Sequence, residues 1–331
     1  IACWEQSATM DDGFPTVHRN LALAYFNKSN DPVKALASLE KAFFIDSTDA
    51  RVLMELDQLY KRLNYAPAIR LELLEKYLPL VVSRDDLYLE RITLCNLLGR
   101  YQQARELIAA RVFHPWEGGE GKVVSQYLLC HLELAKEAIH HGDAKTALEL
   151  LRAAANYPSN LGEGKLAGAQ ENDIHYLEGL AHELAGNTAA AKTAFLAATT
   201  GISEPVQAIF YNDPQPDKIF YQGLAWIKLN EEDRAARIFK KLADFGAQHI
   251  KDVISIDYFA VSLPDLLVFD ADLDLRNAIH CRYIRALGLS GLGNTHLEEA
   301  EALFEEVLKL DINHQGAAVH KQLLEWLPTM I

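Results

Sequence analysis

The tetrad Gly-Glu-Gly-Lys occurs twice in this sequence, at residues 119–122 and 162–165, and the two copies lie 43 residues apart. The glycines permit positive φ angles and close backbone approach, while the Glu and Lys side chains can pair with each other or face a polar ligand. The repetition predicts two structurally equivalent loops. Such loops either contribute to a ligand site or brace the helices that they connect.

Aromatic, amide and carboxylate side chains lie in and near these loops and in a third, Pro-containing stretch at residues 203–217. Tryptophan and tyrosine rings can stack on sugar faces, and amides and carboxylates bond to hydroxyl groups. One hypothesis is therefore a saccharide contact made by Trp116, Glu120, Glu163, Gln170, Asn172, Tyr211 and Asp213. Lys122, Lys165, Asp173 and Asn212 complete this set of candidate ligand-binding residues. The alternative is that these stretches only connect and brace helices.

Other chemical motifs fail on spacing. Asp270, Asp272 and Asp274 resemble the start of a calcium loop, but Leu275 and Cys281 occupy the positions that require Gly and Glu. Neither tetrad is a phosphate-binding loop, because the leading Gly and the Ser or Thr after Lys are missing. No histidine or cysteine pair has zinc-ligand spacing. We therefore expect no metal, no cofactor and no catalysis by this region alone.

The bulk composition limits the class of partner. Acidic side chains outnumber basic ones by 46 to 32, and the net charge of −14 opposes binding to nucleic acid and to anionic lipid. No apolar run approaches the roughly 18 residues of a membrane span. The 4 cysteines lie far apart and predict buried thiols in a reducing compartment, so the expected location is the cytoplasm.

One spacing rule recurs along most of the chain. A small residue is followed by a second small residue twelve positions later, by a large apolar residue four further on, and by another apolar residue three further on. The clearest copies are Gly179-Ala191-Phe195-Ala198, Gly223-Ala235-Phe239-Leu242 and Gly288-Ala300-Phe304-Val307. Turns are expected between the two halves of each copy, at Gly142-Asp143, Gly186-Asn187, Asn230-Glu231 and Gly293-Asn294.

This pattern resembles the tetratricopeptide (TPR) motif of about 34 residues, in which two antiparallel helices touch at small residues. Gly or Ala at the eighth and twentieth motif positions lets the paired helices approach to about 8–10 Å. The aromatic residue or Leu at the twenty-fourth position fills the space toward the next pair, so a hairpin completes its core only by stacking on its neighbours. The resemblance implies an all-α fold, a right-handed α-α superhelix of TPR-type hairpins.

The same rule sets the expected boundaries. Trp4 falls at the twenty-fourth position of a repeat whose first helix would precede Ile1, so we expect a C-terminal piece of a longer polypeptide. The expected segments are the second helix of a truncated repeat at 1–12, TPR-like repeats at 13–112, 128–156 and 174–256, and a last repeat with a capping helix at 278–331. The expected inserts are 113–127, 157–173, 203–217 and 257–277.

The inserts, together with residues 14–25 and 85–91, look like the C-terminal TPR tail of a family of large bacterial proteins. The N-terminal region of those proteins is β-rich and similar to carbohydrate-active enzymes. The resemblance implies that this region docks such an N-terminal domain, or that it is an auxiliary part of the enzyme and supplies saccharide-contacting loops.

The leading hypothesis is a protein-interaction scaffold whose concave face binds another segment of its own polypeptide or a partner protein. A mixture of polar and aromatic side chains on that face suits peptide binding. By repeat position the concave face includes Glu90, Asn96, Glu133, Lys136, Tyr176, Tyr221, Arg282 and Arg285.

Overall fold

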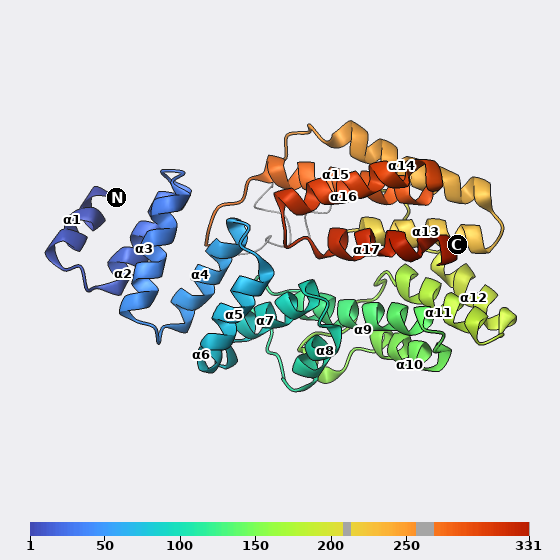
Figure 1. Cartoon of the computed structure of the whole chain (residues 1–331), viewed down its shortest axis with the longest axis horizontal. Coiled ribbons are helices and arrows are strands. Elements are labelled where there is room, and N and C mark those ends of the chain that lie inside the picture. The colour runs from blue at the N-terminus through green and yellow to red at the C-terminus, as the bar shows by residue number, and fades with distance from the viewer. Residues whose placement is uncertain (208–212, 256–267, 331) are drawn as a thin grey trace. The chain divides into compact units, whose positions relative to one another are not determined.

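A computed structural model describes residues 1–207, 213–255 and 268–330, and these residues contain seventeen α-helices and no strand (Figure 1). The expectation of an all-α fold is therefore confirmed. The chain divides into two compact units. Unit 1 comprises residues 1–98 and 265–272, and unit 2 comprises residues 99–264 and 273–331.

Unit 1 begins with a helix that has no buried residue and continues with helices that pack in sequence order, α2 against α3 and α5 against α7. Its helices are α1 (Ala2–Met10), α2 (Pro15–Asn27), α3 (Pro32–Ile45), α4 (Ala50–Arg62), α5 (Pro67–Lys76), α6 (Leu78–Val82) and α7 (Asp85–Leu97). Arg70 is fully buried and bonds Asp57 at 2.7 Å and the predicted concave-face residue Glu90 at 2.5 Å. This ion cluster ties α4, α5 and α7 together.

Unit 2 consists mainly of helical hairpins, in which α9 packs on α10, α11 on α12, α13 on α14 and α15 on α16. Its α-helices are α8 (Tyr101–Ala109), α9 (Lys122–His140), α10 (Ala144–Ala155), α11 (Asn172–Leu184), α12 (Thr188–Ala198), α13 (Pro216–Lys228), α14 (Glu232–His249), α15 (Leu273–Gly291), α16 (Leu297–Leu310) and α17 (Gln315–Met330). Two short 3-10 helices, Ser159–Leu161 and Asn294–His296, lie in connecting segments.

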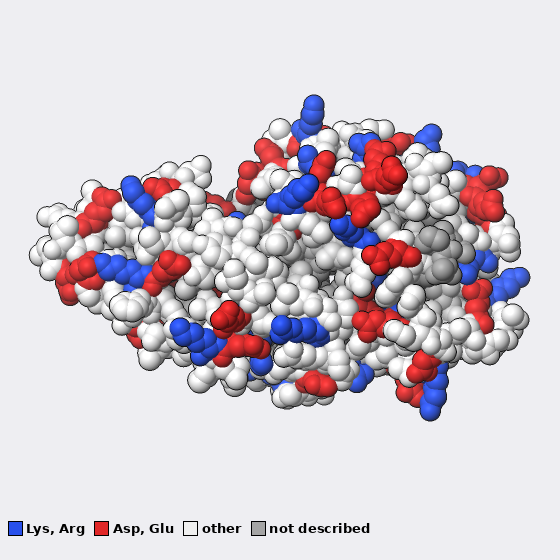
Figure 2. All heavy atoms as spheres, viewed as in Figure 1, with Lys and Arg blue, Asp and Glu red and all other residues white. Residues whose placement is uncertain are grey.

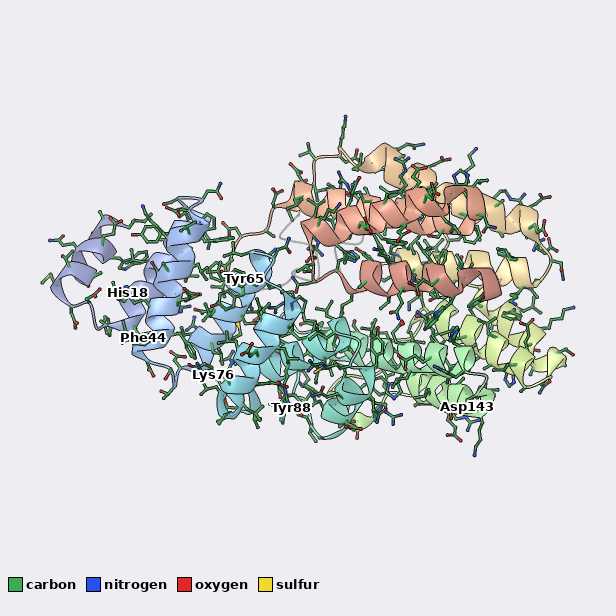
Figure 3. The ribbon with its side chains drawn as sticks, viewed as in Figure 1. His18, Phe44, Tyr65, Lys76, Tyr88 and Asp143 are labelled. Atoms are coloured by element: carbon green, nitrogen blue, oxygen red, sulfur yellow. The ribbon has the colours of Figure 1, made fainter. Side chains whose placement is uncertain are left out.

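The turns inside the hairpins lie where the spacing rule places them. Gly142 ends the α9 helix region with a φ of 80°, a left-handed conformation that favours glycine. Asp143 follows at the start of α10 (Figure 3), and its carboxylate accepts a hydrogen bond of 3.0 Å from the Thr146 backbone N–H. This capping satisfies one of the free donors at the helix start.

Glycines on the first helix of a hairpin make room for aromatic rings on the second. A Cβ atom on Gly179 would lie 2.3 Å from the Phe195 ring, and one on Gly223 would lie 2.3 Å from the Phe239 ring. Both rings are buried. Gly288 differs, because a Cβ there would meet the backbone of Ala243 on the preceding helix, at 2.5 Å. Its small size is needed for packing between hairpins.

Several helices begin inside the segments that we expected to be inserts. α9 begins at Lys122, α11 at Asn172, α13 at Pro216 and α15 at Leu273. Proline at the first helical position explains one of these starts, since its missing N–H has no partner there in any case. Within the described part of the chain, no helix is both long enough and apolar enough to cross a membrane.

Candidate functional site

The two loops that carry the Gly-Glu-Gly-Lys tetrads contact each other in unit 2. A carboxylate oxygen of Glu163, in the second tetrad, accepts a hydrogen bond of 2.8 Å from the backbone N–H of Gly121, in the first. The backbone N–H of Phe113 donates to the Asn160 carbonyl at 2.8 Å. A Cβ atom on Gly162 would lie 2.6 Å from the Phe113 carbonyl oxygen, so only glycine fits. These contacts favour the bracing alternative for both tetrads.

Most of the proposed saccharide-contacting residues also make internal contacts. The Trp116 ring covers Gly119, and Lys165 pairs with Glu171 at 2.5 Å. Asn172 is buried, and its amide donates to the carbonyl oxygens of Ala198 and Thr200, each at 2.7 Å. Asn172 therefore ties the start of α11 to the end of α12 and has no donor left for a ligand.

The remaining candidates of this set are dispersed. Glu120 and Lys122 are exposed, whereas Nε2 of Gln170 is buried and has no hydrogen-bond partner among the described residues. Tyr211 and Asn212 lie outside the described residues, and Asp213 is half-buried just after them. Among the described members of this set, contact between the loops is seen for the two tetrads, whereas Asp173 pairs with Lys218 at the start of α13.

The predicted concave-face residues of unit 2 separate into two groups. Arg282 and Arg285 pair with α16, through Glu306 at 3.0 Å and Glu299 at 2.5 Å. The other four, Glu133, Lys136, Tyr176 and Tyr221, lie among buried side chains. They belong to a group on α9, α11, α13, α15 and α17 that we call the inner cluster, whose remaining members were not predicted for the concave face: Asp173, Lys218, Tyr283 and His320.

Two ion pairs supply the charges of the inner cluster. Lys136 and Glu133 are one helical turn apart on α9, and their charged atoms lie 2.7 Å apart. Burial alone would lower the pKa of Lys136, but Glu133 and Tyr221 stabilise the ammonium group and hold that pKa above its usual value. Lys218, at the start of α13, bonds the Asp173 carboxylate at the start of α11. Both cations are thus neutralised by carboxylates.

Aromatic side chains fill the space around these ion pairs. The ring centroids of Tyr176 and Tyr221 lie 5.6 Å apart, and those of Tyr221 and His320 lie 6.0 Å apart. The hydroxyl of Tyr283 lies 3.1 Å from Nδ1 of His320. Burial, countered in part by Lys136, raises the pKa of Tyr221 to about 12, so this phenol stays protonated at neutral pH.

His320 is the one member of the inner cluster with an open hydrogen-bonding position in the described residues. Its Nδ1 lies 2.8 Å from the Gly316 carbonyl and donates to it in the neutral tautomer, while its Nε2 is buried and has no partner there. Burial, reinforced by the nearby ammonium groups of Lys136 and Lys218, lowers the pKa of His320 to about 3. The imidazole is therefore neutral and offers a single acceptor atom.

The C-terminal helix α17, which contributes His320 to the inner cluster, packs on α16 and also reaches α9 through side chains at two points. At one end the side-chain amides of Gln126 and Gln315 exchange two hydrogen bonds of 2.8 Å. At the other end the His140 and Trp326 rings stack with centroids 4.7 Å apart. The residue numbers of both helices increase from the first contact to the second, so α9 and α17 run in the same direction. Sequence reasoning placed α17 only as a cap on the last hairpin.

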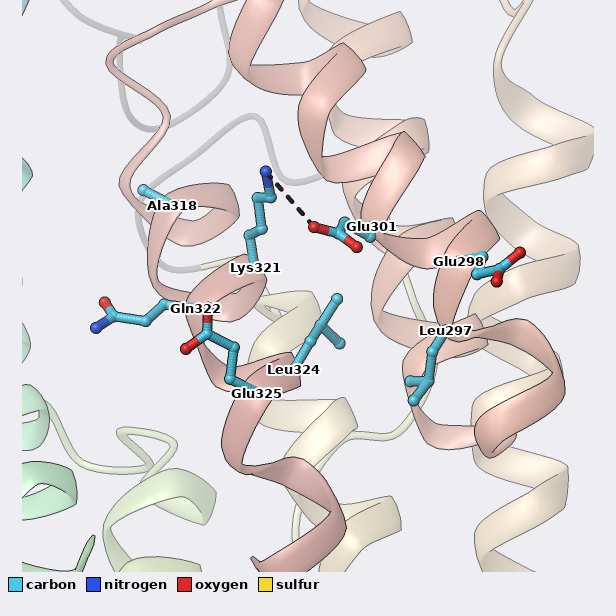
Figure 4. A pocket seen from close by; sticks show the side chains of 8 residues that line it. All are labelled: Leu297, Glu298, Glu301, Ala318, Lys321, Gln322, Leu324 and Glu325. Atoms are coloured by element: carbon cyan, nitrogen blue, oxygen red, sulfur yellow. Dashed lines mark ion pairs between the residues drawn. The ribbon is translucent and has the colours of Figure 1, made fainter.

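The outward side of α17 forms a shallow groove with α16, of about 440 Å³, lined by residues of both helices (Figure 4). Leu297 and Leu324 supply apolar surface, and Lys321 pairs with Glu301 across it at 3.7 Å. Lys and Arg side chains are interspersed with Asp and Glu over the face drawn in Figure 2, without a large area of one sign.

The charged side chains of the inner cluster are paired with one another. Each of its carboxylates is paired with an ammonium group, and its histidine is neutral. No group of three or more His, Cys, Asp or Glu side chains suited to a metal ion occurs in residues 1–207, 213–255 and 268–330. From the sequence, four members are predicted as concave-face residues and Asp173 as a candidate ligand residue, whereas Lys218, Tyr283 and His320 are not predicted. No protein-family model matches the chain.

Proposed function

We propose that this chain is a protein-interaction scaffold of TPR type, which docks another segment of its own polypeptide or a separate protein. The observation that carries the proposal is the close contact of glycine with an aromatic ring, which recurs in successive hairpins at Gly179 and Gly223. It joins the eighth and twenty-fourth positions of the TPR spacing rule, where a small residue leaves room for a large one. Repeated hairpins of this kind present a row of first helices, a common geometry for binding extended or helical segments.

The inner cluster supports a recognition role. Buried, paired charges and neutral aromatic groups select a ligand by shape and hydrogen bonding, and they leave no free base or nucleophile among the groups described. The saccharide alternative has less support, because Glu163 and Asn172 are committed to backbone groups of the chain. We therefore place the binding surface on the first helices of unit 2 rather than on the tetrad loops.

A displayed peptide library tests this function directly. The purified chain is panned against random peptides of about 16 residues, and the selected peptides are measured individually by fluorescence anisotropy. We expect a consensus with amphipathic spacing and dissociation constants below roughly 100 µM, corresponding to about 5 kcal/mol or more of binding free energy. Hydrogen exchange of the complexes should show protection on α9, α11, α13 or α15. Absence of any consensus ligand at this affinity refutes the proposal.

A further inference from the structure

The C-terminal helix α17 packs against the other helices of unit 2 through one face, as a bound helical peptide would. Its buried side chains are Ala317, Val319, His320, Leu323 and Leu327. Val319, Leu323 and Leu327 recur every four residues and Ala317, His320 and Leu323 every three, so together they form one broad helical face. The two charged residues of α17, Lys321 and Glu325, line the outward groove instead (Figure 4). The face that meets the hairpins is thus free of charged side chains.

α17 packs along α16 and α15, and two side-chain contacts near its ends join it to α9. The two end contacts are 14 residues apart on α9 and 11 residues apart on α17. At about 1.5 Å per residue these intervals correspond to roughly 21 Å and 16 Å of helix axis. Between them, His320 reaches Tyr283 of α15, and its ring lies 5.8 Å from that of Phe220 on α13. One amphipathic helix therefore bridges the first helices of three hairpins.

The inner cluster sets the chemistry of a helix that can lie there. Its ion pairs balance, so the surface facing position 320 favours a neutral hydrogen-bonding side chain. A Lys or Arg at that position would be repelled by the ammonium groups of Lys136 and Lys218. An Asp or Glu there would compete with Glu133 and Asp173 for the same two ammonium groups. The pattern of α17 is a small residue, a neutral polar residue three positions later, and large apolar residues three, six and seven positions after the polar one. In α17 these are Ala317, His320, Leu323, Trp326 and Leu327.

We propose that α9, α13 and α15, each the first helix of its hairpin, form a helix-binding groove that α17 occupies in cis. The partner of this chain is then an amphipathic helix that has the same residue pattern as α17 and replaces it. The proposal rests on the proposed scaffold function and names its partner class. Such a partner recovers the contacts that α17 gives up, so the exchange is a competition. A tethered helix competes with an effective concentration of order mM, which sets how tightly a free helix must bind.

The test uses the full chain and a labelled peptide of residues 315–331. Leu323→Ala in the chain weakens α17 in cis and leaves every groove residue in place, because Leu323 belongs to α17 itself. Such truncations of buried leucine reduce stability enough to change an equilibrium about 30-fold or more. We expect negligible peptide binding to the unmodified chain and at least 30-fold tighter binding to the Leu323→Ala chain. Gln322→Ala, at the exposed neighbouring position, is the matched control and should behave like the unmodified chain.

A reversible crosslink provides a second measurement that does not weaken the fold. Cysteines replacing Gln126 and Gln315, in a Cys3→Ser background, are joined by a bismaleimide reagent whose spacer spans the space of the two glutamine side chains and contains a reducible disulfide, because the two backbones are too far apart for a direct disulfide. Combined with Leu323→Ala, the crosslinked chain should lose the peptide, and the same chain after reduction of the spacer should bind it again. Equal binding by the unmodified and Leu323→Ala chains, or binding that survives the crosslink, overturns the proposal. Library peptides that bind while α17 stays protected from hydrogen exchange would preserve the scaffold function and eliminate only this inference.

Discussion

Replacing Gly223 with alanine places a methyl group where the Phe239 ring already lies. The added Cβ atom would be 2.3 Å from the nearest ring carbon, far inside van der Waals contact. The ring is also confined by α15, since a Cβ atom on Gly291 would lie 2.2 Å from the same ring. Phe239 is only 1% exposed and therefore cannot turn toward solvent without leaving the core.

The expected cost follows from two opposing terms. Overpacking of a filled core costs about 1–3 kcal/mol, and the confined ring places this site near the upper value. Alanine regains about 1 kcal/mol of helix propensity over glycine. Gly223→Ala should therefore lower the free energy of unfolding by about 2 kcal/mol, equivalent to a loss of roughly 4–8 °C in Tm for a unit of this size.

Urea unfolding monitored by tryptophan fluorescence measures this change. Phe239→Leu in the same chain removes the ring edge and should restore about half of the loss, which a double-mutant cycle reports as coupling between the two positions. Gly164→Ala is the control, because nothing lies within 4 Å of a Cβ atom there. A neutral or stabilising Gly223→Ala would refute the argument that glycine is required for the approach of α13 to Phe239.

Three further predictions concern unit 2. Asp173→Asn leaves the buried Lys218 ammonium with only the more distant Asp217, at 3.5 Å, and should cost about 3 kcal/mol in urea unfolding, whereas the double change Asp173→Asn with Lys218→Met should recover most of it. Because the pKa of His320 is lowered in the folded chain, the unfolded chain binds the proton at a higher pH. The free energy of unfolding should therefore fall by roughly 1.4 kcal/mol per pH unit as the pH drops from about 6.5 toward about 3. His320→Gln should flatten this dependence between pH 6.5 and pH 5. Asn172→Ala removes the donor to two carbonyl groups and should cost about 1–3 kcal/mol by the same urea assay, while peptide affinity at the α9 face stays unchanged.

The hairpins could be predicted because their determinants are local. Turn residues such as Gly142 and Asp143 act through their own φ angle and through a side-chain bond to a residue three positions away. Gly179 and Phe195 are separated by a fixed number of helical turns, so one spacing rule captures their contact. Such signals are readable in a single sequence, since they need no knowledge of distant segments.

The pairing of the two tetrad loops needed information that the sequence does not carry locally. Glu163 reaches the Gly121 backbone across 42 residues, and the letters of the tetrad are equally compatible with a ligand loop. The inner cluster was recognised in part because Tyr176 and Tyr221 follow from repeat position. His320 was not predicted: α17 does pack on the last hairpin, as expected of a capping helix, but its side-chain contacts with α9 and α13 come from distant segments.

The parallel contact between α9 and α17 has a consequence for how the chain reaches its native state. A linear array of hairpins can form one unit at a time, with each new pair resting on the last. The amide pair of Gln126 and Gln315 instead joins residues 189 positions apart, and such distant contacts slow folding. During synthesis the α9 face therefore emerges long before its own covering helix, and throughout that interval it is open to capture by another helix or by a chaperone.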